Sequence, residues 1–261
     1  MIPCLSIAGF DGSGGAGIQA DLKTLTALGC YGMTVLTALP VQNTCGVKAI
    51  HEIPVACIQQ QLEAIFEDIP PKAIKIGMLY SQTIIEAVAD FLEEHARHTP
   101  IILDPVIVST QGNTLLQPNA IATLKQRLIP RASLITPNIP EAMCLTEKTE
   151  KEALLQDLLR LGCDAVLLTG GHEESTIAKD YFIDQTGARR DFCSKRIATQ
   201  NTHGTGCTLS AAITAYVAQG DELMEACQKA KNYLTGALLS AQHNSLGKGN
   251  GPVNHCFKLD I

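Results

Sequence analysis

Short apolar segments alternate along the chain with longer segments in which apolar residues recur every three or four positions. Residues 2–8 have the pattern of a buried strand, and Ile18, Leu22, Leu25 and Leu28 then follow at helical spacing. Further strands are predicted at residues 33–39, 47–53, 73–76, 101–103, 133–136 and 165–169. Further helices are predicted at residues 55–66, 84–92, 206–218 and 221–242, and another begins at residue 138.

This order of elements predicts a mostly parallel sheet flanked by helices, because strands that alternate with helices form β-α-β units. One exception is expected at residues 180–184 and 189–192, which the turn at 185–188 joins into a β-hairpin. Residues 40–46 are expected to form a loop. No Pro/Ser-rich linker divides the sequence, so we predict a single domain over residues 1–261.

Composition narrows the classes of partner. The formal net charge of -6 disfavours nucleic acid and acidic membrane surfaces, because both bind basic faces. The apolar runs are short and no basic leader precedes them, which predicts a cytoplasmic protein without a membrane segment. The ten cysteines contain no C-x-x-C pair and most lie in apolar periodic segments, so we expect reduced core residues. A small-molecule ligand fits this composition best.

The segment His-Gly-Thr-Gly-Cys at residues 203–207 is the strongest candidate for chemistry. Its two glycines precede a helical pattern and make a helix start whose free N–H groups and dipole favour an anion such as phosphate. The same field is expected to lower the pKa of the Cys207 thiol, which makes it a candidate base or nucleophile. The alternative is a tight turn before a buried helix with a packed Cys207. A nucleophilic pair of Cys207 and His203 is a third interpretation, although both lie in one turn.

A glycine-rich loop follows the first strand at residues 9–17. It contains G-x-G-x-x-G at Gly12, Gly14 and Gly17, as a dinucleotide-binding fold requires. The strand at 33–39 lacks the acidic residue that would hold a ribose, and the chain has no P-loop sequence. We therefore expect the loop to be a wall that faces a ligand, with a simple turn as the alternative.

Several polar residues have two interpretations each. The Gln42 and Asn43 amides can hydrogen-bond the edge of a flat heterocycle, or they are loop amides in solvent. Asp21, one turn into the first helix, is either a partner of the helix dipole or an acceptor for a substrate hydroxyl. Asp104 directly follows the strand at 101–103, and ligands of such sheets lie at the carboxyl ends of the strands.

Asn138 and Glu141 stand three residues apart at a helix start. Their oxygens suit a hydrated Mg²⁺ ion, because this hard cation prefers oxygen ligands and keeps several waters. The alternative is a capping box, in which Asn138 caps the helix and Glu141 closes the box.

Motifs spread over the whole chain closely resemble those of the hydroxymethylpyrimidine/phosphomethylpyrimidine kinases of thiamine biosynthesis, within the ribokinase-like family. The matching segments are residues 8–21, 42–44, 75–79, 134–142, 201–210 and 247–252. The resemblance implies a three-layer α/β/α sandwich with a central mostly parallel sheet. It also implies ATP as co-substrate, Mg²⁺, a pyrimidine substrate and a homo-oligomer, which we take to be a homodimer.

The same resemblance implies roles for individual residues. Gly204, Gly206 and Cys207 would form the catalytic anion hole, with Cys207 in the place of the aspartate base of sugar kinases. The substrate-binding residues would be Gln42, Gly9, Asp21 and Met78. The nucleotide and its phosphates would contact Thr205, Asn138 and Lys231, and Glu141 and Asp104 would bind the metal.

One position departs from the family pattern. Many relatives have Lys immediately before the Gly-Gly-His segment at residues 170–172, and Thr169 stands there in this chain. Threonine cannot supply the positive charge of a phosphate-directed lysine, so Lys231 or Lys248 is expected to compensate in part. Pyridoxal kinases share the template, which makes a B6-vitamer kinase the nearest alternative. A non-catalytic vitamin-binding protein is a further alternative.

Overall fold

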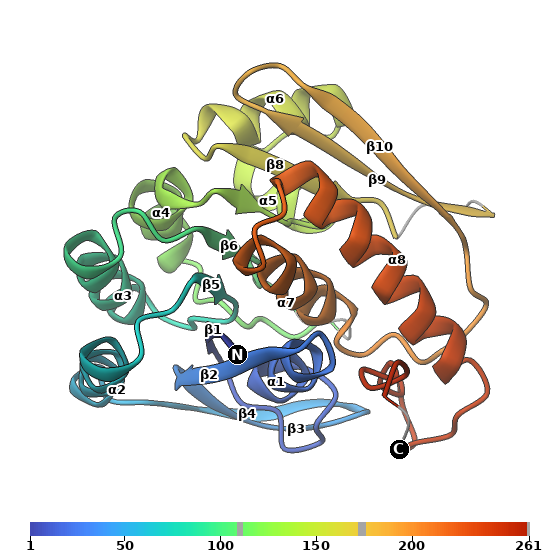
Figure 1. The fold of residues 1–261 in the computed structure, drawn as a ribbon, viewed down its shortest axis with the longest axis horizontal. Coiled ribbons are helices and arrows are strands. Elements are labelled where there is room, and N and C mark those ends of the chain that lie inside the picture. The colour runs from blue at the N-terminus through green and yellow to red at the C-terminus, as the bar shows by residue number, and fades with distance from the viewer. Residues whose placement is uncertain (109–111, 172–175, 260–261) are drawn as a thin grey trace.

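The computed structural model describes residues 1–108, 112–171 and 176–259, shown as a ribbon in Figure 1. The strands in these residues are β1 (Ile2–Ala8), β2 (Cys30–Leu36), β3 (Ala38–Asn43), β4 (Gly46–Glu52), β5 (Ala73–Ile76), β6 (Ile101–Leu103), β7 (Leu134–Ile135), β8 (Ala165–Thr169), β9 (Ile177–Asp184) and β10 (Arg189–Lys195). The helices are α1 (Gly17–Ala27), α2 (Val55–Asp68), α3 (Gln82–His95), α4 (Ala120–Thr123), α5 (Ile139–Thr146), α6 (Lys151–Arg160), α7 (Thr205–Ala218) and α8 (Leu223–Ala241). Two short helical segments, η1 (Leu124–Leu128) and η2 (Ile129–Arg131), continue α4.

The main sheet has eight strands in the order β10-β9-β8-β7-β6-β5-β1-β2. Pairing is parallel from β2 to β8, and only β8–β9 and β9–β10 are antiparallel. The predicted parallel sheet is therefore confirmed, and the predicted hairpin is β9–β10 at its edge. Because β1 lies between β2 and β5, the strand order reverses beside β1, which is where open α/β sheets bind ligands.

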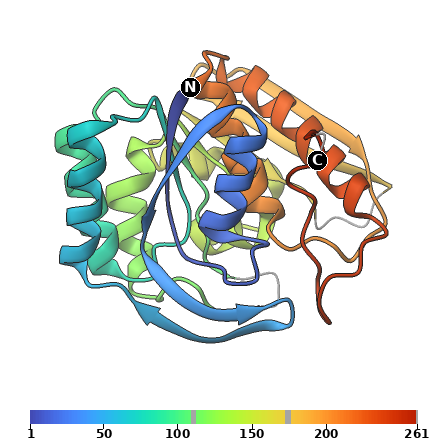
Figure 2. The ribbon, with the colours of Figure 1, turned by 60° about the horizontal axis from the view of Figure 1, so that its bottom comes forward.

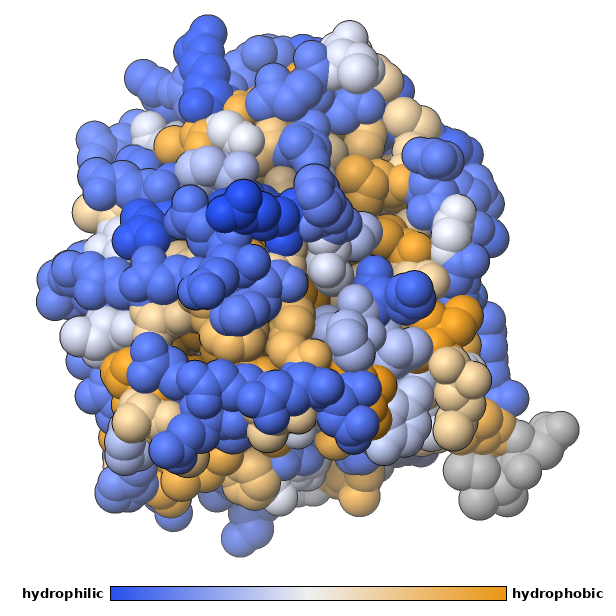
Figure 3. All heavy atoms as spheres, turned by 60° about the vertical axis from the view of Figure 1, so that its left-hand side comes forward, coloured by the Kyte–Doolittle hydropathy of each residue, from blue (hydrophilic) through white to orange (hydrophobic). Residues whose placement is uncertain are grey.

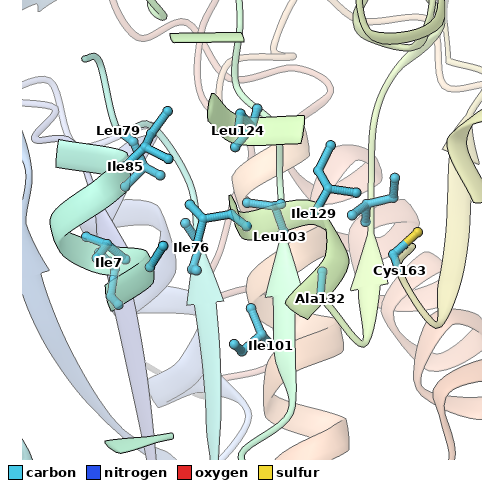
Figure 4. Packing of buried hydrophobic residues seen from close by; sticks show 14 of the residues in the cluster. Ile7, Ile76, Leu79, Ile85, Ile101, Leu103, Leu124, Ile129, Ala132 and Cys163 are labelled. Atoms are coloured by element: carbon cyan, nitrogen blue, oxygen red, sulfur yellow. The ribbon is translucent and has the colours of Figure 1, made fainter. Parts of the chain in front are cut away.

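Helices cover both faces of this sheet. On one face α7 and α8 lie side by side, with α1 next to α7, and α2, α3, α5 and α6 cover the other (Figure 1). Alternate strand residues supply the two cores: Leu103 packs with the second group of helices and Ile102 with α7 and α8. Figure 4 shows Ile7, Ile76 and Leu103 of three neighbouring strands within the larger core. The three-layer prediction is confirmed.

The prediction of a loop at 40–46 is wrong. The parallel pairing of β2 with β1 ends at Leu36. The next residue, Thr37, donates from its Oγ1 to the Met78 carbonyl, and the chain then leaves the main sheet as the β3–β4 hairpin. This two-stranded sheet runs along one side of the molecule (Figure 2). Pro40 does not prevent the pairing because each strand has one partner only, and the register shifts between Val41 and Gln42.

Other expectations also change. All ten cysteines, which lie within the described residues, are free, but only Cys4, Cys30, Cys163 and Cys227 are buried, so the prediction that most are core residues is wrong. The α4–η1–η2 segment and α6 are helical where no pattern above was assigned.

The face in Figure 3 is mostly hydrophilic, with hydrophobic residues in smaller groups between hydrophilic ones. Among the described residues, no helix combines the length and the apolar character needed to cross a membrane.

Core packing gives a direct test. Leu62 of α2 is fully buried in the larger core, so Leu62→Ala removes apolar contacts and leaves a cavity. We expect the free energy of unfolding to fall by about 2–5 kcal/mol, measured by urea denaturation. Leu239→Ala in α8 is the matched control, because Leu239 is 57% exposed, and its effect should stay within about 0.5 kcal/mol. Equal losses in the two variants would contradict the assignment of the core.

Candidate active site

The carboxyl ends of β1, β5, β6 and β7 meet the start of α7 at a cavity of ≈ 700 Å³. Gly9 directly follows β1 and Asp104 directly follows β6, so the glycine loop and Asp104 lie on the same rim, formed by the carboxyl ends of the strands. Most of the predicted site residues line this cavity: Gly9, Gln42, Met78, Asp104, Asn138, Glu141, Gly204, Thr205, Gly206, Cys207 and Lys231.

The start of α7 has the form of an anion site. Gly204 is the N-cap with φ 81°, and a Cβ there would lie 1.8 Å from the Gly15 carbonyl oxygen, so only glycine fits. The N–H groups of Gly206 and Cys207 belong to the first turn, where helices have no internal acceptor. Gly206 is exposed and lines the cavity, so this turn is open to a ligand.

Cys207 differs from its prediction. The residue is half-buried, and desolvation raises the pKa of its thiol to about 12. Lys75 opposes this rise, whereas the carboxylates of Asp21 and Asp104 add to it. The prediction of a lowered pKa is therefore wrong, because burial and two nearby carboxylates outweigh the field of the helix start. At neutral pH the resting side chain is a thiol.

His203 joins the two glycine-rich segments. Its Nε2 lies 2.8 Å from Asp11 Oδ2, and its ring packs against Gly15. Burial alone would raise the pKa of Asp11, but hydrogen bonds from His203 and Ser13 lower it to about 2. The Asp11 carboxylate also accepts hydrogen bonds from Ser13 Oγ and from the N–H groups of Ser13, Gly15 and Ala16. His203 thus holds the glycine loop through Asp11 and does not use this nitrogen to activate Cys207.

Gln42, Gly9 and Met78 form another wall of the cavity. Gln42 Nε2 donates to the Phe10 carbonyl over 3.2 Å, which fixes the amide while its Oε1 and second N–H remain as bonding groups. Gln42 belongs to β3, next to the register shift, and not to a loop. A Cβ on Gly9 would lie 2.9 Å from Met78 Sδ, so glycine allows the two segments to approach closely.

Asp21 lies behind the cavity wall. It is fully buried, and its carboxylate accepts hydrogen bonds from Ser6 Oγ at 2.5 Å and from Lys75 Nζ at 2.9 and 3.1 Å. Burial alone would lower the pKa of Lys75, but Asp21, and then Cys207 and Asp104, raise it above its usual value. Lys75, unlike Asp21, lines the cavity.

Two carboxylates lie close enough to repel each other, Asp104 after the end of β6 and Glu141 in the first turn of α5. Burial, and then the negative charge of Asp104, raise the pKa of Glu141 to about 8, and burial raises that of Asp104 to about 6. Asn138 and Glu141 form the capping box: Glu141 N donates to Asn138 Oδ1, and Asn138 N donates to Glu141 Oε2. Thr136 Oγ1 lines the same cavity and is buried without a partner in the described part of the chain.

These oxygens fit a magnesium ion. Buried carboxylates that repel each other are stabilised by a divalent cation, and Mg²⁺ binds through one or two carboxylates plus waters and phosphates. The capping bond to Asn138 N uses Glu141 Oε2, while the contact of Oε1 with the described residues is a long one of 3.4 Å to Ile107 N. No group of three or more His, Cys, Asp or Glu side chains arranged for a metal occurs in the residues that the structure describes.

A buried cation lies near Thr169. Thr169 pairs with Asp180 between β8 and β9, and Asp180 Oδ2 accepts a 2.7 Å hydrogen bond from Lys231 Nζ of α8. Thr169, Asp180 and Lys231 all line the cavity, whereas Lys248 does not. His172 of the expected Gly-Gly-His segment lies outside the described residues.

Sequence reasoning missed Lys75, Thr136 and Asp180 as parts of this site. Lys75 left a signal, because it is the only charged residue in the short buried strand β5. Thr136 and Asp180 left none, since their places on the cavity wall depend on the pairing of distant strands.

Comparisons with known proteins agree with this geometry. A model of the phosphomethylpyrimidine kinase family matches residues 11–254. The hydroxymethylpyrimidine/phosphomethylpyrimidine kinase of Salmonella typhimurium is 47% identical, over 97% of this chain and 97% of that protein. The thiamine biosynthesis bifunctional protein ThiED of Geobacter sulfurreducens is 50% identical over 98% of this chain, which spans about half (52%) of that relative.

Among solved structures, the pyridoxal kinase of Staphylococcus aureus in complex with AMP-PCP and pyridoxal superimposes with a TM-score of 0.88. It is 29% identical and covers 100% of this chain and 96% of its own. The likeness extends to the whole α/β architecture. The family match covers every cavity residue that follows Phe10 in the sequence. By sequence and by fold, the chain belongs to the phosphomethylpyrimidine kinase family.

Proposed function

We propose that this protein is an ATP- and magnesium-dependent kinase. It phosphorylates the hydroxymethyl group of 4-amino-5-hydroxymethyl-2-methylpyrimidine and then the resulting monophosphate, for thiamine biosynthesis. The observation that carries this proposal is one cavity that contains an open helix start, two neighbouring carboxylates and a fixed amide. A helix start stabilises the transferring phosphoryl group, and an amide recognises a flat heterocycle.

The pyrimidine lies against Gly9, Gln42 and Met78 in this proposal. Gln42 pairs its free amide groups with the ring nitrogen and amino group, while Met78 packs on the ring face. Asp21 acts from behind the wall, because its oxygens already bind Ser6 and Lys75. This corrects the expectation that Asp21 is itself the acceptor for a substrate hydroxyl.

The transfer step takes place between this wall and the start of α7. The oxygen of the acceptor hydroxyl forms a bond to the γ-phosphorus, the bond to the bridging oxygen breaks, and ADP keeps that electron pair. Positioning and charge stabilisation dominate such transfers, and the hydroxyl proton passes to an oxygen of the transferred group. Cys207 contacts the acceptor hydroxyl as a thiol and orients it, since its raised pKa opposes a role as resting base. The N–H groups of Gly206 and Cys207, next to Gly204 and Thr205, bind the phosphoryl oxygens.

Glu141 and Asp104 would hold the magnesium ion, which neutralises phosphate charge when it is bound. Asn138 keeps the Glu141 carboxylate in place through the capping box. Lys231, held by Asp180, supplies a positive charge beside Thr169, where many relatives have a lysine. It thereby contacts the nucleotide phosphates.

A pyridoxal kinase activity is the second candidate. The superposition on a pyridoxal kinase solved with AMP-PCP and pyridoxal favours it, because a pyridine ring and a pyrimidine ring have the same shape. A homodimer in the cytoplasm, with no nucleic-acid partner, remains the prediction for the assembled protein.

Turnover tests the proposal directly. We expect magnesium-dependent formation of ADP with the pyrimidine alcohol and with its monophosphate, measured in a coupled assay, and slower or no turnover with pyridoxal. Isothermal titration calorimetry with the same pyrimidine detects binding that occurs without phosphoryl transfer. Binding of the pyrimidine without ADP formation would contradict the kinase assignment and support a vitamin-binding protein, and faster turnover of pyridoxal would favour the second candidate.

Substitutions at Cys207 separate its roles. Cys207→Ala should leave the affinity for the pyrimidine within about threefold and lower kcat by about 10- to 100-fold, because it removes a transition-state contact. Cys207→Asp should keep part of the activity if the position needs only a hydrogen-bond acceptor. Intact-mass spectrometry of the wild type during turnover should show no adduct. A kcat in Cys207→Ala equal to that of the wild type would contradict any contact between the thiol and the reacting group.

The raised pKa of Glu141 predicts a pH-dependent stability. Between the usual value of 4.5 and about 8, the unfolded chain releases this proton and the folded chain keeps it. The free energy of unfolding of the metal-free protein should therefore fall as pH rises through this range. Glu141→Gln retains the capping acceptor without the charge. The thermal midpoint of this variant should therefore fall less between pH 5 and pH 9 than that of the wild type.

Two controls accompany that measurement. Glu63→Gln, at an exposed position of α2, should keep the pH dependence of the wild type. Addition of Mg²⁺ with ADP at pH 8 should stabilise the wild type and not Glu141→Gln. A Glu141→Gln protein with the same pH profile as the wild type would contradict the burial of this charge.

A further inference from the structure

Lys75 is a charged side chain in the middle of the main sheet. Its strand, β5, pairs with β1 and β6, and all four residues of the strand are buried. The side chain of Lys75 has no exposed surface. Lysine is almost never fully buried in proteins without a paired charge, so this position needs a physical explanation.

Asp21 and Ser6 hold the ammonium group in place. Ser6 is the register partner of Lys75 in β1, and both side chains donate to the carboxylate of Asp21 in α1. The hydrogen bonds of Lys75 Nζ to described residues go to the two oxygens of Asp21. A lysine has three N–H donors, so one of them has no acceptor in this network.

The ammonium group reaches the carboxyl end of the sheet. A Cβ on Gly77, which follows the strand, would lie 2.7 Å from Lys75 Nζ, so the side chain extends past the strand toward the rim. Lys75 lines the cavity there, on the face of the sheet that α7 covers. Cys207 and Asp104 are both close enough to interact with its charge.

Stability alone does not explain this arrangement. Replacing a buried ion pair with well-packed apolar residues is often neutral or stabilising, because the charges lose their hydration. A fixed cation with a free donor is useful where negative charge gathers, as it does on a phosphoryl group during transfer.

We propose that Lys75, held by Asp21 and Ser6, supplies the fixed positive charge beneath the phosphoryl group at the start of α7. The inference rests on the proposed kinase function and adds to it a residue that stabilises the transition state more than the bound substrates. Asp21 is then a positioning residue that acts through Lys75.

Kinetics of Lys75→Met test this role. Methionine has a similar length without the charge, and we expect kcat to fall about 100-fold while KM for the pyrimidine changes less than about threefold. Because Asp21 would be left unpaired, a double variant, Lys75→Met with Asp21→Leu, removes both charges and should restore the thermal stability of the wild type. Its kcat should remain low.

Lys72→Met, at an exposed position just before β5, is the matched control and should keep the wild-type kcat. A folded double variant with wild-type kcat would overturn the role of Lys75, as would a change confined to KM. Turnover by the wild type in the same assay distinguishes a failure of the proposed function from a failure of the role of Lys75. Its absence would contradict the proposed function together with this inference, whereas normal wild-type turnover with an active double variant contradicts the role of Lys75 alone.

Discussion

The hydrogen bond between Asp11 and His203 joins the parts of the chain on which the site depends. Asp11 organises the first glycine loop through its bonds to backbone N–H groups, and His203 directly precedes the Gly204 cap of α7. The backbone N–H of His203 also donates to the Gly251 carbonyl, in a bridge between His203 and Pro252 of the C-terminal segment. Segments nearly 200 residues apart in sequence thereby form one wall. The position of the α7 start over the cavity follows from this contact.

Burial of charge is the second constraint on the cavity. Asp104 and Glu141 are mostly desolvated, and their pKa values rise because water no longer stabilises the ionised forms. Lys75 and Lys231 are buried within the wall, where they form ion pairs with Asp21 and Asp180. The site therefore contains fixed cations and carboxylates that gain from a metal ion. In the proposed function, a nucleotide and its magnesium ion would bring the charges that complement these groups.

The fold could be predicted largely from the sequence, because β1, β5, β6 and β8 are short, mainly apolar segments that alternate with helical patterns. Of the β3–β4 hairpin, the sequence predicts only the second strand, at residues 47–53, because Pro40 and the polar Gln42–Asn43 end obscure the alternation of β3. The order of strands and helices in the sequence also predicts which residues lie at the strand ends and at the start of α7. The pKa of Cys207 could not be predicted, because it depends on burial and on charges from α1, β5 and the end of β6. The local sequence indicates the electric field of a helix start, but burial and neighbouring charges decide the pKa of the thiol.

In the proposed function, the start of α7, with Lys75 beneath it, holds the phosphoryl group during transfer. A crystal structure with ADP, Mg²⁺, fluoroaluminate and the pyrimidine alcohol tests it most directly. We expect the planar fluoroaluminate to lie between the substrate oxygen and ADP, within hydrogen-bond distance of the backbone N–H groups of Gly206 and Cys207. The ring should lie against Gln42 and Met78. Fluoroaluminate bound away from the α7 start, or a pyrimidine whose hydroxyl points away from it, would contradict the account.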